Sequence, residues 1–141
     1  RPIHGGDNMA EYKSKQVRIN KPDEAIYAVL SDFGNFTPIV ADKVEEWNAT
    51  EETCSFKAKG FTVKLRMVER EPHKLIKITG DDIPFEFFFW IQLKSVAPDD
   101  TRMLLTLRAE LNMMMKMMIG GKLQKGLDEM ADKIAAAFNA V

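Results

Sequence analysis

Cysteine and histidine are both scarce in this sequence. Cys54 is the only cysteine among 141 residues, so no intrachain disulfide can form, and a small buried side chain is the simplest interpretation of it. The two histidines are His4 and His73, and His73 follows Pro72 at a predicted turn with no Cys or His at metal-ligand spacing. We therefore expect neither a metal site nor a cofactor.

Long apolar runs are also missing. The richest stretch, from Met113 to Ile119, is interrupted by Lys116, so we expect no membrane-spanning segment. No excess of one charge exists either: 20 Lys and Arg balance 21 Asp and Glu, spread along the chain. Because phosphate binding needs clustered positive charge, this balance argues against nucleic acid as a partner. The default expectation is a cytoplasmic protein, since the sequence has no apolar signal core.

The length is typical of one domain that buries a sizeable core. Residues 1–8 (RPIHGGDN) precede Met9, and we interpret them as a leader or an expression-derived remnant. Residues 9–141 are predicted to form a single domain, because no linker rich in Pro, Gly or Ser and no internal repeat divides them.

The periodicity of the first forty residues changes from that of a strand to that of a helix. Residues 12–19 are compatible with a β-strand. Pro22 and the acidic residues after it suit the first turn of a helix whose apolar positions continue to Phe33, and Gly34 is expected to end that helix in a left-handed conformation. Residues 35–40, which include Pro38, are predicted to form a short helical turn or an ordered loop.

Turn signals then recur every eight to twelve residues or so, as in an antiparallel meander. After Asn112 an apolar stripe of helical period runs to the end of the chain and predicts one long amphipathic helix. We therefore predict an α+β fold: a curved seven-stranded antiparallel sheet, two short helices after the first strand, and a long C-terminal helix across the concave face. Six strands are predicted after the short helices, over residues 44–49, 53–59, 62–71, 74–80, 85–96 and 101–112.

The predicted strands divide cleanly into an apolar inward face and a polar outward face. No charged residue falls in the inward sets, whereas Lys64, Arg66, Lys77, Arg108 and Glu110 point outward. General acid–base or nucleophilic catalysis needs an ionisable or nucleophilic group beside the reacting atoms. The strands supply none, so we predict no catalytic residue.

Five methionines, Met113, Met114, Met115, Met117 and Met118, are followed by Gly120 and Gly121. Methionine repacks easily around ligands, and each helical glycine costs about 1 kcal/mol relative to alanine. One hypothesis is that this part of the helix lines or gates a cavity. The alternative is that the methionines fill the core and the glycines allow close packing of helix and sheet.

The segment FEFFFW, residues 85–90, places Phe88 and Trp90 on the face opposite Phe87 and Phe89. Two large aromatic side chains near solvent can form a docking patch or a weak homodimer interface. Scattered surface aromatics are also common, and that alternative remains open.

Residues 18–40 (RINKPDEAIYAVLSDFGNFTPIV) resemble the opening of START-like domains of the SRPBCC superfamily. Pro22, Val29, Leu30, Asp32 and Pro38 carry the likeness, and the meander and terminal helix extend it over most of residues 12–141. The resemblance implies a helix-grip fold with a cavity between the sheet and the long helix. Such domains bind lipids, sterols, isoprenoids or polyketides, and some are cyclases or aromatases that place polar side chains in the cavity, which this sequence does not.

The leading prediction is therefore a non-enzymatic protein that binds or carries an apolar small molecule such as a lipid, isoprenoid or polyketide. The alternatives are a cyclase or dehydratase, and an interaction module or homodimer that uses Phe88 and Trp90. Gln92, Thr62 and Tyr27 are candidates for polar contacts at the mouth. The predicted cavity residues are Tyr27, Phe56, Val63, Leu65, Met67, Ile76, Ile78, Phe87, Phe89, Ile91, Met103, Leu105, Leu107, Met114, Met117, Met118 and Gly121.

Overall fold

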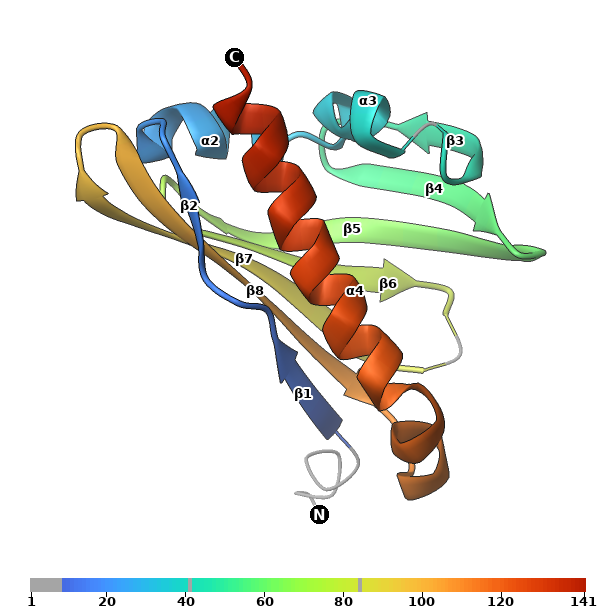
Figure 1. Ribbon diagram of the computed structural model, residues 1–141. Helices are drawn as coiled ribbons and strands as arrows, with labels where there is room; N and C mark the ends of the chain where they lie inside the picture. The colour runs from blue at the N-terminus through green and yellow to red at the C-terminus, as the bar shows by residue number, and fades with distance from the viewer. Residues whose placement is uncertain (1–8, 41, 84) are drawn as a thin grey trace.

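The computed structural model describes residues 9–40, 42–83 and 85–141; the predicted leader, residues 1–8, lies outside them. One curved antiparallel sheet has the strand order β1-β8-β7-β6-β5-β4-β3, and β2 also pairs with β8. The long helix α4 crosses the concave face of the sheet, and short helices close one end (Figure 1). The predicted α+β architecture is confirmed.

The strands of the meander begin and end within two residues of their predicted bounds. Successive strands pair antiparallel through short turns, as the spacing of the turn signals requires. The strands are β3 (Glu45–Ala49), β4 (Thr53–Ala58), β5 (Phe61–Glu71), β6 (Leu75–Asp81), β7 (Phe87–Ala97) and β8 (Asp100–Glu110).

The predicted first strand, residues 12–19, is in fact two strands. β1 (Met9–Lys13) and β2 (Val17–Ile19) follow one another along the same edge of β8, and three residues between them oppose two residues of β8. Ser14 causes this bulge, because its buried hydroxyl takes the place of a backbone acceptor and accepts the Leu105 N–H at 2.9 Å. Since β1 and β2 share one position, the sheet keeps the seven predicted positions.

The first helix is shorter than its apolar pattern indicates. α2 (Asp23–Leu30) ends before Phe33, and a 3₁₀ turn η1 (Phe33–Phe36) and the short helix α3 (Thr37–Val40) follow. The prediction that Gly34 ends α2 with a left-handed conformation is wrong, because Gly60 is the glycine with positive φ in the described part of the chain. Instead, the Asp32 carboxylate accepts the Gly34 N–H at 2.8 Å and caps η1.

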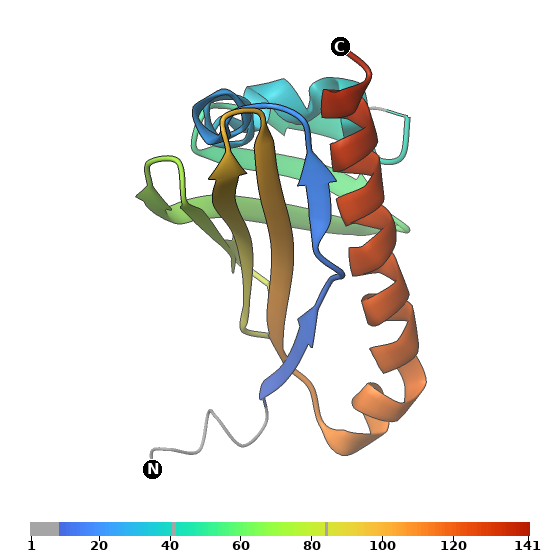
Figure 2. The ribbon, with the colours of Figure 1, turned by 60° about the vertical axis from the view of Figure 1, so that its left-hand side comes forward.

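The helix α4 (Met113–Asn139) starts where the Asn112 side chain accepts the Met115 N–H at 2.9 Å. It lies against β1, β2 and β8 (Figure 2). Its polar side chains bind backbone groups along the edge formed by β1, β2 and the residues between them: Gln124 donates to the Lys13 carbonyl at 2.6 Å, and Asp128 accepts the Lys15 N–H at 2.7 Å. No helix in the described ranges is long and apolar enough to cross a membrane.

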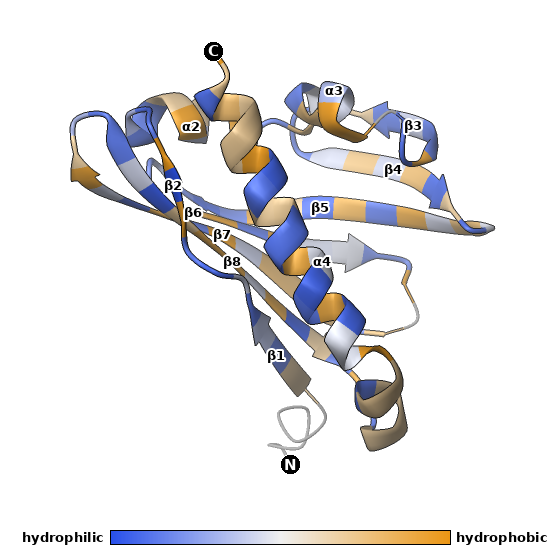
Figure 3. Ribbon diagram, viewed as in Figure 1, coloured by the Kyte–Doolittle hydropathy of each residue, from blue (hydrophilic) through white to orange (hydrophobic). Residues whose placement is uncertain are grey.

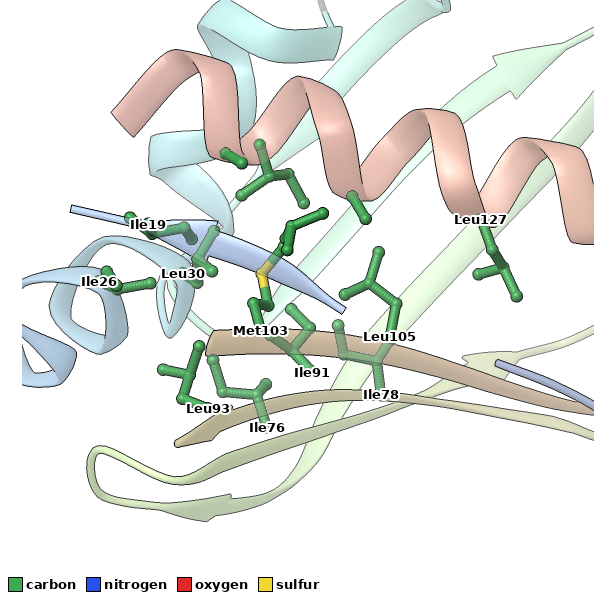
Figure 4. Close-up of a cluster of buried hydrophobic side chains, with 14 of the residues drawn as sticks. Ile19, Ile26, Leu30, Ile76, Ile78, Ile91, Leu93, Met103, Leu105 and Leu127 are labelled. Atoms are coloured by element: carbon green, nitrogen blue, oxygen red, sulfur yellow. The ribbon is translucent and has the colours of Figure 1, made fainter. Parts of the chain in front are cut away.

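The closed core lies where α2, β2 and the C-terminal half of α4 meet the sheet (Figure 4). Ile19, Ile26, Leu30, Met103 and Leu105 are completely or almost completely buried there. The hydropathy pattern follows this arrangement, with alternating residues on the strands and a mixed surface on α4 (Figure 3). Burial of these aliphatic side chains is the main source of stability at this end of the molecule.

Shortening a side chain on the inner face of β8 should lower the free energy of unfolding more than shortening one on the outer face. Leu105 is fully buried, whereas the neighbouring Leu104 is only half-buried on the outer face. We expect Leu105→Ala to lower the free energy of unfolding by roughly 2–5 kcal/mol, through lost burial and the cavity left behind. Leu104→Ala should cost about 1 kcal/mol or less. Urea denaturation followed by circular dichroism measures both, and equal losses would contradict the assignment of the two faces.

Candidate functional site

A cavity of about 500 Å³ lies between α4, the short helices and the sheet. Its volume falls within the range of roughly 300–1,000 Å³ that is common for small-molecule sites. It lies beside the closed core, toward the edge of the sheet formed by β3, β4 and β5. Its walls are formed by Leu30, Phe33, Phe36, Ile39, Val40, Lys43, Trp47, Cys54, Phe56, Val63, Leu65, Ile78, Phe87, Phe89, Leu107, Gly126, Glu129, Met130, Lys133 and Ile134.

The sheet forms the floor of the cavity. Alternate residues of β4 to β8 face it, because side chains of a strand point to opposite faces in turn. Phe56 and Val63 are direct neighbours across β4 and β5, as are Phe89 and Leu107 across β7 and β8. No residue that these strands contribute to the floor is charged.

Aromatic side chains from η1 and β3, with Ile39 and Val40 of α3, form the side wall. The rings of Phe33 and Phe36 pack edge to face with their centroids 5.4 Å apart, and Trp47 lies 6.0 Å from Phe56. The indole N–H of Trp47 donates to the Thr37 hydroxyl at 2.8 Å. This hydrogen bond satisfies the polar atom of Trp47 and leaves its apolar ring for the cavity.

The mouth opens between α4 and the turn after α3. Lys43 comes from that turn, and Gly126, Glu129, Met130 and Lys133 come from successive turns of α4. All five residues line the cavity and are also exposed to solvent, which places them at its opening. The charged groups of the cavity are therefore at the rim.

Two ammonium groups meet at this mouth. The neighbouring Lys43 side chain and desolvation lower the pKa of Lys133. The carboxylates of Glu129 and Asp42 oppose this shift but do not cancel it. The charged residues at the rim are two lysines and one glutamate, beside an apolar interior.

Cys54 is buried in the wall of the cavity. Desolvation raises the pKa of its thiol to about 11, although a backbone hydrogen bond with Leu65 acts in the opposite direction. The group is therefore a protonated thiol near neutral pH, which is a weak nucleophile.

Part of the predicted set of cavity residues lines the observed cavity. Phe56, Val63, Leu65, Ile78, Phe87, Phe89 and Leu107 line it. Met67, Ile76, Ile91, Met103 and Leu105 face the same side of the sheet but belong to the closed core, where α2, β2 and α4 fill the space. The sequence pattern distinguishes the two faces of the sheet, but it does not show which inward residues belong to the closed core and which line the cavity.

The methionine segment lies away from the cavity. Met114, Met117 and Met118 are 69%, 81% and 69% exposed, and Gly121 is exposed with no atom near the position of a Cβ. None of these four residues lines the cavity. Gly120 is buried, and a Cβ there would lie 3.0 Å from the Tyr12 hydroxyl, so this glycine serves the close packing of α4 on β1.

The polar candidates for the mouth also lie elsewhere. Tyr27 packs edge to face against His73, with ring centroids 5.8 Å apart, and Thr62 is exposed. Gln92 accepts the Thr106 hydroxyl at 2.7 Å on the outer face of the sheet. None of the three is part of the cavity wall.

Sequence reasoning did not select the side wall or the mouth. The residues it missed are Leu30, Phe33, Phe36, Ile39, Val40, Lys43, Trp47, Cys54, Gly126, Glu129, Met130, Lys133 and Ile134. One signal could have found the wall: apolar residues occur on both sides of Pro38, in a segment too short to build a core of its own. The lysines of the mouth carry no such signal, because they fall among ordinary surface charges.

On the outer face of the sheet, Phe88 and Trp90 are half-buried and pack on each other, with centroids 6.0 Å apart. The Lys77 ammonium lies 4.6 Å from the Phe88 ring centroid and 5.4 Å from that of Trp90. These cation–π contacts cover part of the aromatic surface. Self-association through this face stays a prediction.

The described residues hold no cluster of three or more His, Cys, Asp or Glu side chains suited to a metal ion. The His73 side chain is exposed.

No family model matches the sequence, and no curated protein matches it in sequence. Several solved structures are similar in fold. Norcoclaurine synthase from Thalictrum flavum, in complex with dopamine and hydroxybenzaldehyde, has a TM-score of 0.70 at 13% identity, over 97% of this chain and 91% of that one. A protein from Thermobifida fusca has a TM-score of 0.65 at 14% identity, over 83% and 84% of the two chains.

The Zhui aromatase/cyclase from Streptomyces has a TM-score of 0.59 at 16% identity, over 72% of this chain and 67% of that one. At these identities the likeness concerns the fold. The shared features are the curved antiparallel sheet, the short helices after the first strand position and the long C-terminal helix on the concave face. This chain therefore has the helix-grip fold of START-like proteins.

Proposed function

We propose that this protein binds an apolar small molecule in the cavity between α4, the short helices and the sheet. The observation that carries the proposal is a cavity of about 500 Å³ whose interior is lined by aliphatic and aromatic side chains, with charged groups only at the rim. Transfer of an apolar ligand from water to such a surface is favourable by about 25 cal/mol per Å² of buried apolar area.

The nature of the ionisable groups favours binding over catalysis. The charged lining residues Lys43, Glu129 and Lys133 are all exposed at the mouth, and the one buried ionisable group, Cys54, is a protonated thiol. A cyclase or dehydratase would need an acid or base beside the reacting atoms of the ligand. The interior of this cavity supplies shape and apolar contact instead.

Gly126 allows a direct test, because it lines the cavity and no atom lies within 4 Å of the position of a Cβ. Gly126→Phe should obstruct the cavity, as should Val63→Phe from the sheet side. Gly121→Phe is the matched control, since Gly121 is equally unobstructed on the same helix but outside the cavity. We expect the first two variants to lose at least tenfold in affinity for the neutral fluorescent probe N-phenyl-1-naphthylamine, a change of about 1.4 kcal/mol.

The control variant should bind the probe like the unmodified protein. Equal binding by all four proteins would place the probe elsewhere and count against the proposal. Native mass spectrometry of protein purified without detergent adds a second measurement. We expect an apolar compound that dissociates on denaturation, and Gly126→Phe should reduce its amount.

The Cys54 thiol reports on the same cavity. Because its pKa is about 11, roughly one thiol in a thousand is ionised at pH 8, so we expect slow labelling by Ellman's reagent at that pH. Labelling should accelerate as the pH rises toward 11, and N-phenyl-1-naphthylamine should slow it by occupying the cavity. Urea-unfolded protein is the control and should react rapidly. Fast labelling of the folded protein at pH 8 would contradict the buried, protonated thiol.

A further inference from the structure

Two lysines from distant parts of the chain converge at the mouth of the cavity. Lys43 follows α3, and Lys133 lies on α4, ninety residues later. Both line the cavity, and both side chains are exposed at its mouth. Such a pair is unfavourable by itself, because each ammonium group repels the other.

Nearby carboxylates do not neutralise the pair. Within the described ranges, neither Lys43 nor Lys133 forms a salt bridge with a carboxylate. Glu129, the acid at the mouth, forms its ion pair with Lys125 instead, at 3.9 Å along the helix. Asp42 and Glu129 contribute only a longer-range attraction. By contrast, Lys15, between β1 and β2, pairs with Asp132 of α4 at 2.6 Å.

The position of the pair is as important as its charge. The two ammonium groups lie where the apolar interior meets solvent, so a molecule seated in the interior would present one end to them. A negative group at that end would accept charge-assisted hydrogen bonds from both lysines and remove their mutual repulsion. A positive group would add a third like charge.

From this juxtaposition we infer that the ligand is an amphipathic anion: an apolar body in the cavity and one carboxylate or phosphate group held between Lys43 and Lys133. The inference rests on the proposed function and adds the chemical class of the ligand. The apolar walls supply affinity for the body, and the two lysines select the head group and fix which end faces the mouth.

Four probes with the same twelve-carbon chain separate the contribution of the head group from that of the body. Dodecanoate, dodecyl phosphate, 1-dodecanol and dodecylamine, each below its critical micelle concentration, compete with N-phenyl-1-naphthylamine for the unmodified protein. We expect one or both anions to bind roughly ten- to a hundredfold more tightly than the alcohol, the range typical of hydrogen bonds to charged groups. The amine should bind most weakly. The two anions compared with each other distinguish a carboxylate site from a phosphate site.

The double variant Lys43→Gln/Lys133→Gln should lose this preference, so that the anions bind it no more tightly than dodecanol does. Lys94→Gln/Lys122→Gln is the matched control, because it removes the same charge from exposed lysines outside the cavity and should leave the preference intact. Lys43→Glu/Lys133→Glu should reverse the preference toward dodecylamine, a gain that a merely destabilised protein would not show.

The outcomes separate this inference from the proposed function. If the neutral probe binds but the anions have no advantage over dodecanol, the head-group site is wrong and the apolar cavity stands. An advantage that survives in the Lys43→Gln/Lys133→Gln variant also overturns the site. If neither the probe nor any chain binds the unmodified protein, both proposals fail.

Discussion

The position of α4 rests on hydrogen bonds from its polar side chains to the backbone of the edge strands. Gln124, Asp128 and Asn139 bind backbone groups of β1, β2 and the bulge between them. An edge strand presents unpaired N–H and carbonyl groups, which are costly if buried without partners and invite other strands if left exposed. The helix satisfies them and is held along one side of the concave face.

This placement has a consequence for the other side of the sheet. Where α4 meets β2, β8 and α2, aliphatic side chains such as Ile19 and Leu105 fill the space. The edge formed by β3 to β5 lies farther from the helix, and η1 and α3 lie beside it. Apolar side chains of η1 and α3, together with Trp47 of β3, form a wall without filling the volume, and a cavity remains. The same sheet face thus has a packed half and a hollow half.

Charged side chains lie at the rim of the cavity and not in its interior, as electrostatics requires. A charged side chain inside the cavity would lose its hydration without a partner, which costs several kcal/mol, and the strands supply none to it. At the rim, Lys43, Glu129 and Lys133 keep access to water. In the function that we propose, the two lysines select the head group of the ligand and the apolar surface supplies its affinity, while the buried Cys54 stays protonated.

The sequence by itself determined the order of elements, the bounds of the meander and the two faces of the sheet, because period-two and helical patterns are local properties of the chain. The resemblance of the entry segment around Pro22 and Pro38 to START-like domains also predicted the helix-grip fold. It did not reveal the bulge at Ser14, because there the Ser14 hydroxyl replaces a backbone acceptor for the N–H of Leu105, 91 residues away in the sequence. Only the tertiary structure decided which inward residues fill the core and which line the cavity, and it brought Lys43 and Lys133 together. Both outcomes depend on where α4 crosses the sheet, and the polar residues that hold it there look in the sequence like ordinary solvent-facing positions of an amphipathic helix.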